Sequence, residues 1–102
     1  MIHQESPDNL PPVHSGELLA DELKALDLSA TKFATRIGVP TNAITEILKG
    51  ERRITAKMAL RLGKVFGTGE RYWLNLQTNY DVKLARAELH DKVEEIVPLV
   101  AA

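Results

Sequence analysis

The stretch that decides the fold is LSATKFATRIGVPTNAITEILKG, residues 28–50. Ser29 is a typical helix N-cap, because its hydroxyl can accept a hydrogen bond from an otherwise unpaired backbone N–H. It therefore predicts a helix over residues 30–37. Gly38 predicts the end of that helix, since glycine tolerates the left-handed conformation in which many helices finish. The first half of the stretch is thus a short helix followed by a sharp turn.

The second half of the stretch predicts another short helix, which begins at Pro40 or Thr41 and ends at Gly50. Its spacing turns Ile44, Ile47 and Leu48 toward the core. The outward positions are then Thr41, Asn42, Ala43, Thr45, Glu46 and Lys49. Two short helices around a Gly-Val-Pro turn form the helix-turn-helix layout, whose second helix enters the major groove of DNA. The stretch therefore predicts a DNA-binding unit.

Outward polar side chains on the second helix are the candidate base readers, namely Thr41, Asn42, Thr45 and Glu46. Asparagine can pair bidentately with adenine, and glutamate can accept a hydrogen bond from the cytosine amino group. Two alternatives remain open at this stage. Thr41 could act only as a helix cap, and Glu46 could be a solvated side chain near Arg52 or Arg53.

Residues around this helix are candidate phosphate contacts, namely Ser29, Thr31, Lys32, Lys49, Arg52, Arg53 and Lys57. Several of them lie at predicted helix N-termini, where free N–H groups and the helix dipole attract phosphate.

The distribution of charge along the sequence supports this assignment to phosphate contacts. Residues 1–28 carry six acids and one base (−5), residues 29–74 nine bases and three acids (+6), and residues 75–102 five acids and three bases (−2). A basic middle between acidic ends indicates a nucleic-acid surface, although solvated basic helix faces produce the same pattern.

The remaining segments also predict helices, and no stretch alternates apolar and polar residues as a half-buried strand would. The first helix is expected over residues 15–26, with Leu19, Leu23 and Leu26 inward. Thr55 caps a fourth helix that ends at Gly67, and Thr68 or Gly69 opens a fifth. Beyond Tyr80, a further helix runs to near Pro98. The expected fold is all-α: a five-helix repressor-like helix-turn-helix domain with an additional C-terminal helix.

Three regions follow from this pattern. Residues 1–13 hold three prolines and are expected to form a flexible arm, residues 14–80 the DNA-binding domain, and residues 81–102 a C-terminal helix and tail that dimerise. The candidate dimer contacts are Trp73, Leu76, Tyr80, Val82, Leu89 and Val93. Trp73 and Tyr80 could instead stack on nucleic acid, but their spacing favours a place in a core or a subunit interface.

Composition excludes several classes of protein. The chain has 102 residues, enough for one domain, and no cysteine, so disulfides and thiolate metal sites are excluded. No apolar run approaches the roughly 18 residues of a membrane helix, and residues 1–14 lack a signal-peptide pattern, so we expect a cytoplasmic protein. His14, Glu17 and Asp21 share a helical face, but such groupings commonly arise by chance. No enzymatic constellation, metal site or cofactor is expected.

The chain resembles the Cro/repressor class of helix-turn-helix proteins through LS-x-x-x-F-A-x-x-I-GV-P. Within that class it is similar to the HigA-type antitoxins of toxin–antitoxin modules over about residues 14–81. This narrower likeness is carried by HSGELL (14–19), ILKGERRITAKMALRLGKVFGTG (47–69) and YWLNLQTNYDV (72–82). The chain departs from the usual pattern at Ser15, where proline is common, and at Gly69-Glu70, where Ser-Pro often opens the helix.

The resemblance implies an antitoxin that represses its own operon and neutralises a co-encoded toxin, typically a small mRNA endoribonuclease. Because enzymes that cut RNA present basic surfaces, the acidic side chains Glu17, Asp21 and Glu22 are the candidate toxin contacts. Two other functions remain open: a phage-type or metabolic repressor without a toxin partner, and a protein-interaction module that does not bind DNA. The basic segment argues against the interaction module.

Overall fold

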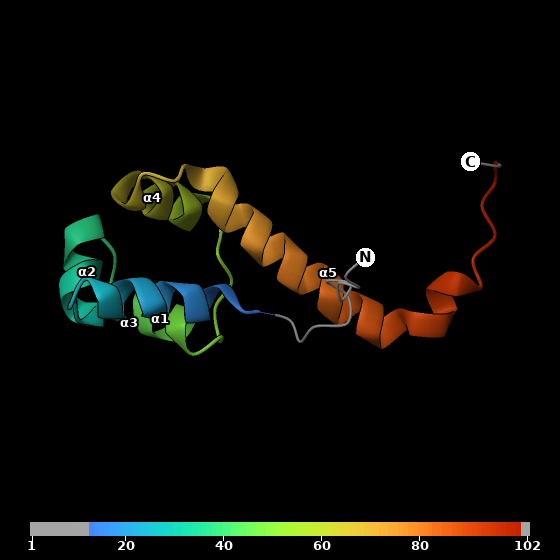
Figure 1. Cartoon of the computed structure of the whole chain (residues 1–102), viewed down its shortest axis with the longest axis horizontal. Coiled ribbons are helices and arrows are strands. Elements are labelled where there is room, and N and C mark those ends of the chain that lie inside the picture. Colours follow the sequence, from blue (N-terminus) through green and yellow to red (C-terminus); the bar gives the residue numbers. More distant parts are fainter. Residues whose placement is uncertain (1–12, 101–102) are drawn as a thin grey trace, which may run out of the picture.

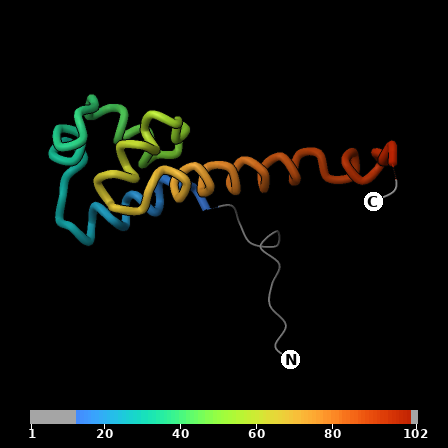
Figure 2. Tube along the Cα trace, turned by 90° about the horizontal axis from the view of Figure 1, so that it is seen from above, coloured from blue at the N-terminus to red at the C-terminus, as the bar shows by residue number. Residues whose placement is uncertain are grey.

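The computed structural model describes residues 13–100, so the arm predicted for residues 1–13 lies outside the described residues except for Val13. Five helices make up this part of the chain, which contains no strand: α1 (Ser15–Ala25), α2 (Ala30–Ile37), α3 (Thr41–Leu48), α4 (Ala56–Phe66) and α5 (Glu70–Glu94). Helices α1 to α3 pack together, α4 packs on α2 and α5, and α5 projects away from the bundle (Figures 1 and 2). The predicted all-α class is confirmed. No helix of the described region has the length and apolarity needed to cross a bilayer.

Local signals set the helix ends as predicted in most places. Ser29 accepts a hydrogen bond from the Lys32 backbone N–H (3.1 Å), and Thr55 accepts one from Met58 (3.2 Å). Gly38 adopts the left-handed conformation (φ 76°) and ends α2. The short turn that follows brings α3 directly beside α2. These caps place the two helices of the predicted DNA-binding unit.

The end of α1 differs from the prediction. Leu26 was expected to face inward, but it is 54% exposed. Asp27 takes a left-handed conformation (φ 55°), and the N–H of Leu28 bonds to the carbonyl of Leu23 (2.9 Å), which closes the helix in a Schellman turn. Leu26 lies at the cap of this turn, so its side chain points away, and Leu28 packs against the core instead.

The core lies between the five helices and is completed by aromatic side chains. Phe33 of α2 stacks on Phe66 of α4 with ring centroids 5.6 Å apart, and Phe66 lies 5.6 Å from Trp73 of α5. Trp73 is 1% exposed, and its indole N–H donates to the Thr68 hydroxyl (3.1 Å). The row therefore joins α2, α4 and α5, and the buried indole donor has its partner.

Helix α5 (Glu70–Glu94) consists of two helical segments joined by a kink at His90 (φ 24°, ψ −103°). It passes Tyr80 without a break, although a separate helix was expected beyond that residue. The reason is visible in the sequence, because no glycine or proline stands between residues 70 and 94. At 1.5 Å per residue, the segment before the kink is about 30 Å long. The second half of α5 is exposed and reaches away from the core (Figure 2).

Candidate nucleic-acid interface

Helix α3 rests on both α1 and α2, so its buried face is broad. Ile44 and Ile47 are fully buried, as predicted, and Ala43 is also buried at 5% exposure. The expectation that Ala43 faces outward is therefore wrong. An eight-residue helix that contacts two neighbours covers more than one narrow stripe, and a small side chain lets it approach closely. Asn42 and Lys49 are exposed, as expected.

The four candidate base readers lie on the same helix but differ in their surroundings. Asn42 is exposed, whereas Thr41, Thr45 and Glu46 are half-buried. Thr41 is the first residue of α3, and Pro40 stands at the N-cap, so Thr41 is not the cap. The Thr45 hydroxyl donates to the backbone carbonyl of Asn42 (3.3 Å). Asn42 is thus the most accessible of the four candidate base readers.

Glu46 is paired with Arg52. The Arg52 Nε donates to Glu46 Oε1 (2.9 Å), and Arg52 Nη2 lies 2.7 Å from the same oxygen. This is the arrangement that the sequence left open as an alternative to base reading. Both side chains are more than a third exposed, and an ion pair of this kind contributes only about 0–1 kcal/mol to stability. A phosphate could therefore replace the carboxylate at little cost.

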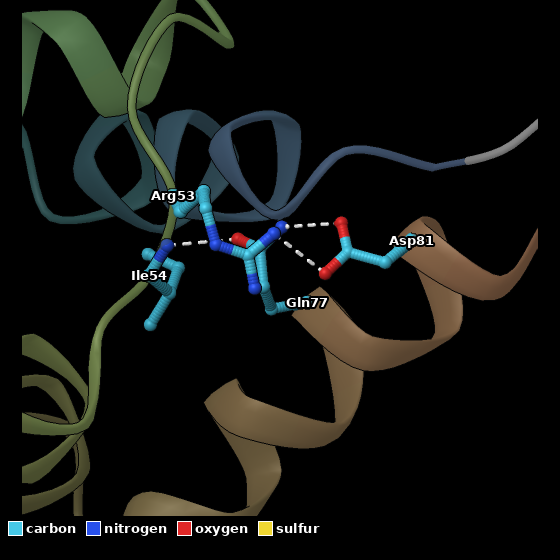
Figure 3. A network of polar contacts seen from close by, with 4 residues as sticks. All are labelled: Arg53, Ile54, Gln77 and Asp81. Atoms are coloured by element: carbon cyan, nitrogen blue, oxygen red, sulfur yellow. Dashed lines mark hydrogen bonds and ion pairs between the residues drawn. The ribbon is translucent and has the colours of Figure 1, made fainter. Parts of the chain in front are cut away.

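Arg53 points to a different element from Arg52. Its Nη1 lies 2.7 Å from Asp81 Oδ2 on α5. Asp81 also accepts from Gln77 Nε2 (3.0 Å), and Gln77 Oε1 accepts from the Ile54 backbone N–H (2.8 Å), as Figure 3 shows. We refer to residues 49–55 as the α3–α4 connection. Two adjacent arginines of this connection are thus held by carboxylates on opposite sides, one on α3 and one on α5.

Sequence reasoning missed Gln77 and Asp81. The available signal was Gln77 itself, which stands four residues after Trp73 and therefore falls on the same buried stripe of α5. A polar residue on such a stripe requires hydrogen-bond partners, and Gln77 is 4% exposed. The partner of its oxygen is a backbone N–H, which no side-chain pattern reveals.

The other candidate phosphate contacts lie at the starts of α2 and α4 and just after α3. Ser29 and Lys32 lie at the start of α2 with Thr31, and Lys57 lies in the first turn of α4. Lys32, Lys49 and Lys57 are exposed and form no ion pair within residues 13–100. Helices α2 and α3 lie together at one end of the molecule, and α5 projects from the other (Figure 2). These cations are therefore available to an anionic partner.

The N-terminus of α1 explains two of the residues singled out as acidic or metal-binding. His14 Nδ1 accepts from the Gly16 N–H (2.8 Å), while Glu17 accepts from the His14 N–H (3.0 Å). This reciprocal pair is a capping box, so both side chains serve the helix end. Asp21 and Glu22 are exposed on the same helix. No cluster of three or more potential metal ligands occurs among residues 13–100.

The candidate dimer residues separate into three groups by burial. Trp73 belongs to the core of its own chain, so its assignment to a dimer interface is wrong, and it is not accessible for stacking on nucleic acid. Leu76 and Tyr80 are half-buried, and the Tyr80 ring packs edge-on against His14 with centroids 4.9 Å apart. The assignment failed at Trp73 because the aromatic row of Phe33 and Phe66 occupies that side of α5. The three residues further along the helix, Val82, Leu89 and Val93, are exposed.

Comparison with known proteins places this geometry in a family. The helix-turn-helix family profile matches residues 19–73, more than half of the chain. The structure of a HigA-family addiction module antidote protein from Coxiella burnetii is 49% identical, with a TM-score of 0.85, over 87% of this chain and 99% of that one. The chain belongs to the HigA family of helix-turn-helix antitoxins. The HigA resemblance noted in the sequence is thereby confirmed.

Two further relatives show how far the likeness extends. Pseudomonas aeruginosa antitoxin HigA, solved with the higBA promoter, is 37% identical with a TM-score of 0.81, over 87% of this chain and 99% of that one. Virulence-associated protein I of Dichelobacter nodosus is 41% identical over 93 residues, which cover 90% of this chain and 85% of the relative. The HigA fold thus extends over almost the whole described chain.

Proposed function

We propose that this chain represses transcription by binding operator DNA as a dimer, with α3 in the major groove. The observation that carries the proposal is the outward face of α3 between exposed cations. Asn42 is exposed there, and Lys32, Lys49 and Lys57 lie on the flanking segments. The promoter bound by the P. aeruginosa HigA structure supports the same use of this fold. Asn42, Thr41, Thr45 and Glu46 read base edges, and Asn42 is the principal reader because its side chain is the most exposed of the four.

The phosphate contacts in this proposal come from three places along the chain. Ser29, Thr31 and Lys32 act at the start of α2, Lys57 acts at the start of α4, and Lys49, Arg52 and Arg53 act in the α3–α4 connection. When DNA binds, a phosphate exchanges with the Glu46 carboxylate at Arg52 and leaves Glu46 available to a base. In the unbound chain, Arg52 and Glu46 are therefore paired with each other.

A dimer explains the exposed apolar side chains of α5. Val82, Leu89 and Val93 are each between 43% and 46% exposed, and they recur at intervals of seven and four residues. Val82 and Leu89 lie on one face of the segment before the kink at His90, Val93 lies just beyond the kink, and a second copy of the chain would cover them. Two helix-turn-helix units joined in this way read half-sites about 34 Å apart.

We further propose that the chain neutralises a co-encoded toxin by direct binding. Support comes from the family, whose members are antitoxins, and from the acidic side of α1. Asp21 and Glu22 are exposed and form no ion pair among the described residues. An acidic surface of this kind favours fast association with a basic, RNA-cutting enzyme. Glu17 contributes charge as well, although its carboxylate is also part of the capping box.

Operator binding is tested by fluorescence anisotropy with the DNA upstream of the gene and with a scrambled duplex of equal length. The expected result is preference for the upstream DNA and an affinity that falls with salt, by a log–log slope of about −0.9 for each phosphate neutralised. Equal affinity for the two duplexes would rule out a sequence-specific repressor.

Toxin binding is tested by co-expression with the neighbouring reading frame and pull-down. Reversal of Asp21 and Glu22 to lysine should weaken the complex, while Glu17 is left unchanged to preserve the cap of α1. The matched control reverses Glu88 and Glu95, two exposed glutamates of the α5 region. If only the control variant loses the toxin, the interface lies on the C-terminal helix. If no partner is captured by any variant, the chain is a repressor without a toxin.

A further inference from the structure

Helix α5 holds the α3–α4 connection by a chain of three polar contacts. The backbone N–H of Ile54 donates to Gln77 Oε1 (2.8 Å), and the Gln77 amide group donates to Asp81 Oδ1 (3.0 Å). The second oxygen of Asp81 accepts from Arg53 Nη1 (2.7 Å). Figure 3 shows these groups between the connection and α5, with Gln77 and Asp81 one helical turn apart on α5. Backbone and side chain of the connection are thus both bound by the same helix.

The order of donors and acceptors leaves Gln77 one orientation. Its oxygen must face Ile54, because a backbone N–H can only donate. Its NH₂ group then faces Asp81, which accepts as a carboxylate. Ile54 has a buried side chain and Gln77 is 4% exposed, so the Ile54 N–H has no easy access to water. Truncation of either side chain on α5 would therefore loosen the connection at a buried point.

Arg53 is directed by this network. The only polar partner of its guanidinium within residues 13–100 is Asp81, and its side chain is 67% exposed. A guanidinium has five N–H donors in a fixed plane, so several remain for a second anion after one is bound. Arg52, by contrast, places both Nε and Nη2 on one oxygen of Glu46. Asp81 binds Arg53 through one nitrogen, so most of the guanidinium donors stay available.

We infer that Gln77 and Asp81 are positioning residues for DNA binding: from α5, they hold the α3–α4 connection where its cations meet the phosphate backbone. The inference rests on the proposed operator binding. It gives these two residues of the 72–82 segment a role in DNA affinity, although neither lies on α3. A connection held in advance loses less conformational freedom when DNA binds, and this lowers the cost of association.

The test compares Asp81→Ala with Asp81→Asn in the full-length chain, using operator anisotropy at several salt concentrations. Asp81→Ala removes the acceptor for Gln77 and the partner of Arg53, and operator affinity should fall about tenfold, as expected when one or two side chains must be ordered on binding. The salt slope should become shallower by about 0.9 for each phosphate that the variant no longer neutralises. Asp81→Asn retains an oxygen that can accept from Gln77, so it should restore most of the affinity.

The matched control is Glu88→Ala, which removes an exposed carboxylate seven residues further along α5 and therefore on a similar side of the helix. Its affinity for operator should stay at or slightly above that of the unmodified chain, because only repulsion is removed. All variants are compared well below their unfolding temperatures. Hydrogen exchange of the Ile54 amide supplies a second readout, and it should become faster in Asp81→Ala than in Glu88→Ala.

Three outcomes separate the possibilities. If Asp81→Ala binds operator as tightly as the unmodified chain, the inference is wrong. If both Asp81 variants bind more tightly with a steeper salt slope, Asp81 withholds Arg53 from DNA, which also overturns it. If the unmodified chain does not distinguish operator from scrambled DNA, the proposed repressor function is wrong. Hydrogen exchange of the Ile54 amide then still tests whether Asp81 holds the connection.

Discussion

Ser15→Pro should stabilise the chain, because Ser15 combines a buried hydroxyl with a backbone position that suits proline. The side chain is 1% exposed, and its Oγ has no hydrogen-bond partner among the described residues. Ser15 is the first residue of α1, whose N–H has no acceptor within the helix. His14, which precedes it, is extended (φ −76°, ψ 139°), the conformation that a residue before proline prefers. Proline at this position therefore removes no hydrogen bond of the helix.

Two contributions set the magnitude. A buried hydroxyl without a partner costs about 1–3 kcal/mol of desolvation, which an apolar side chain does not incur. A proline at a compatible position adds about 0.4–1 kcal/mol by restricting the unfolded chain. Fitting the ring into a fully packed site offsets part of this gain. We expect a net increase of about 1–3 kcal/mol in the free energy of unfolding, or roughly 4–8 °C in Tm for each kcal/mol.

Thermal and urea unfolding followed by circular dichroism measure the effect. Ser15→Ala is the matched control, since it removes the hydroxyl and leaves the backbone unrestricted, and it should give the larger share of the gain. The difference between the proline and alanine variants then reports the backbone contribution. A loss of stability in Ser15→Ala would refute the reasoning, because it would mean that the hydroxyl has a partner.

Other predictions concern recognition, assembly and packing. Asn42→Ala should reduce discrimination between operator and scrambled DNA by about 1–3 kcal/mol in anisotropy titrations, whereas Arg52→Ala should weaken binding to both and flatten the salt slope; the same effect from both variants would contradict the assigned roles. Leu89→Glu combined with Val93→Glu should yield monomers in sedimentation experiments without lowering Tm, and a persistent dimer would move the interface. Gly63→Ala should destabilise by about 1–3 kcal/mol in urea unfolding, since its Cβ would overlap the Gly69 carbonyl group; unchanged stability would show that the start of α5 can shift.

The helices were predictable because their ends depend on local chemistry. Ser29, Gly38 and Thr55 act through hydrogen bonds or backbone angles within a few residues, so sequence alone identifies them. Leu26 was misplaced for a related reason. Its spacing from Leu23 suits a continuing helix, but Asp27 turns the chain, and aspartate is a weaker signal for a left-handed turn than glycine.

The environment of the candidate site was less predictable because it depends on distant contacts. Ala43 is buried since α3 packs on two helices, and no property of a single helix pattern reveals its second neighbour. Arg53 and Asp81 are 28 residues apart in sequence, and their pairing follows only from how α5 crosses the connection. The pairing of Glu46 with Arg52 spans six residues and was foreseeable as an alternative, although not as the arrangement of the unbound chain.

The 72–82 segment shows how a family signature can arise from the fold. Its likeness to HigA antitoxins initially suggested a toxin partner, yet the structure accounts for its most distinctive members within the chain. Trp73 completes the aromatic core, Gln77 and Asp81 hold the α3–α4 connection, and Tyr80 packs on His14. Trp73 and Gln77 are buried, so they are not accessible to a partner. The proposed toxin contacts therefore fall on exposed residues, such as Asp21 and Glu22 of α1.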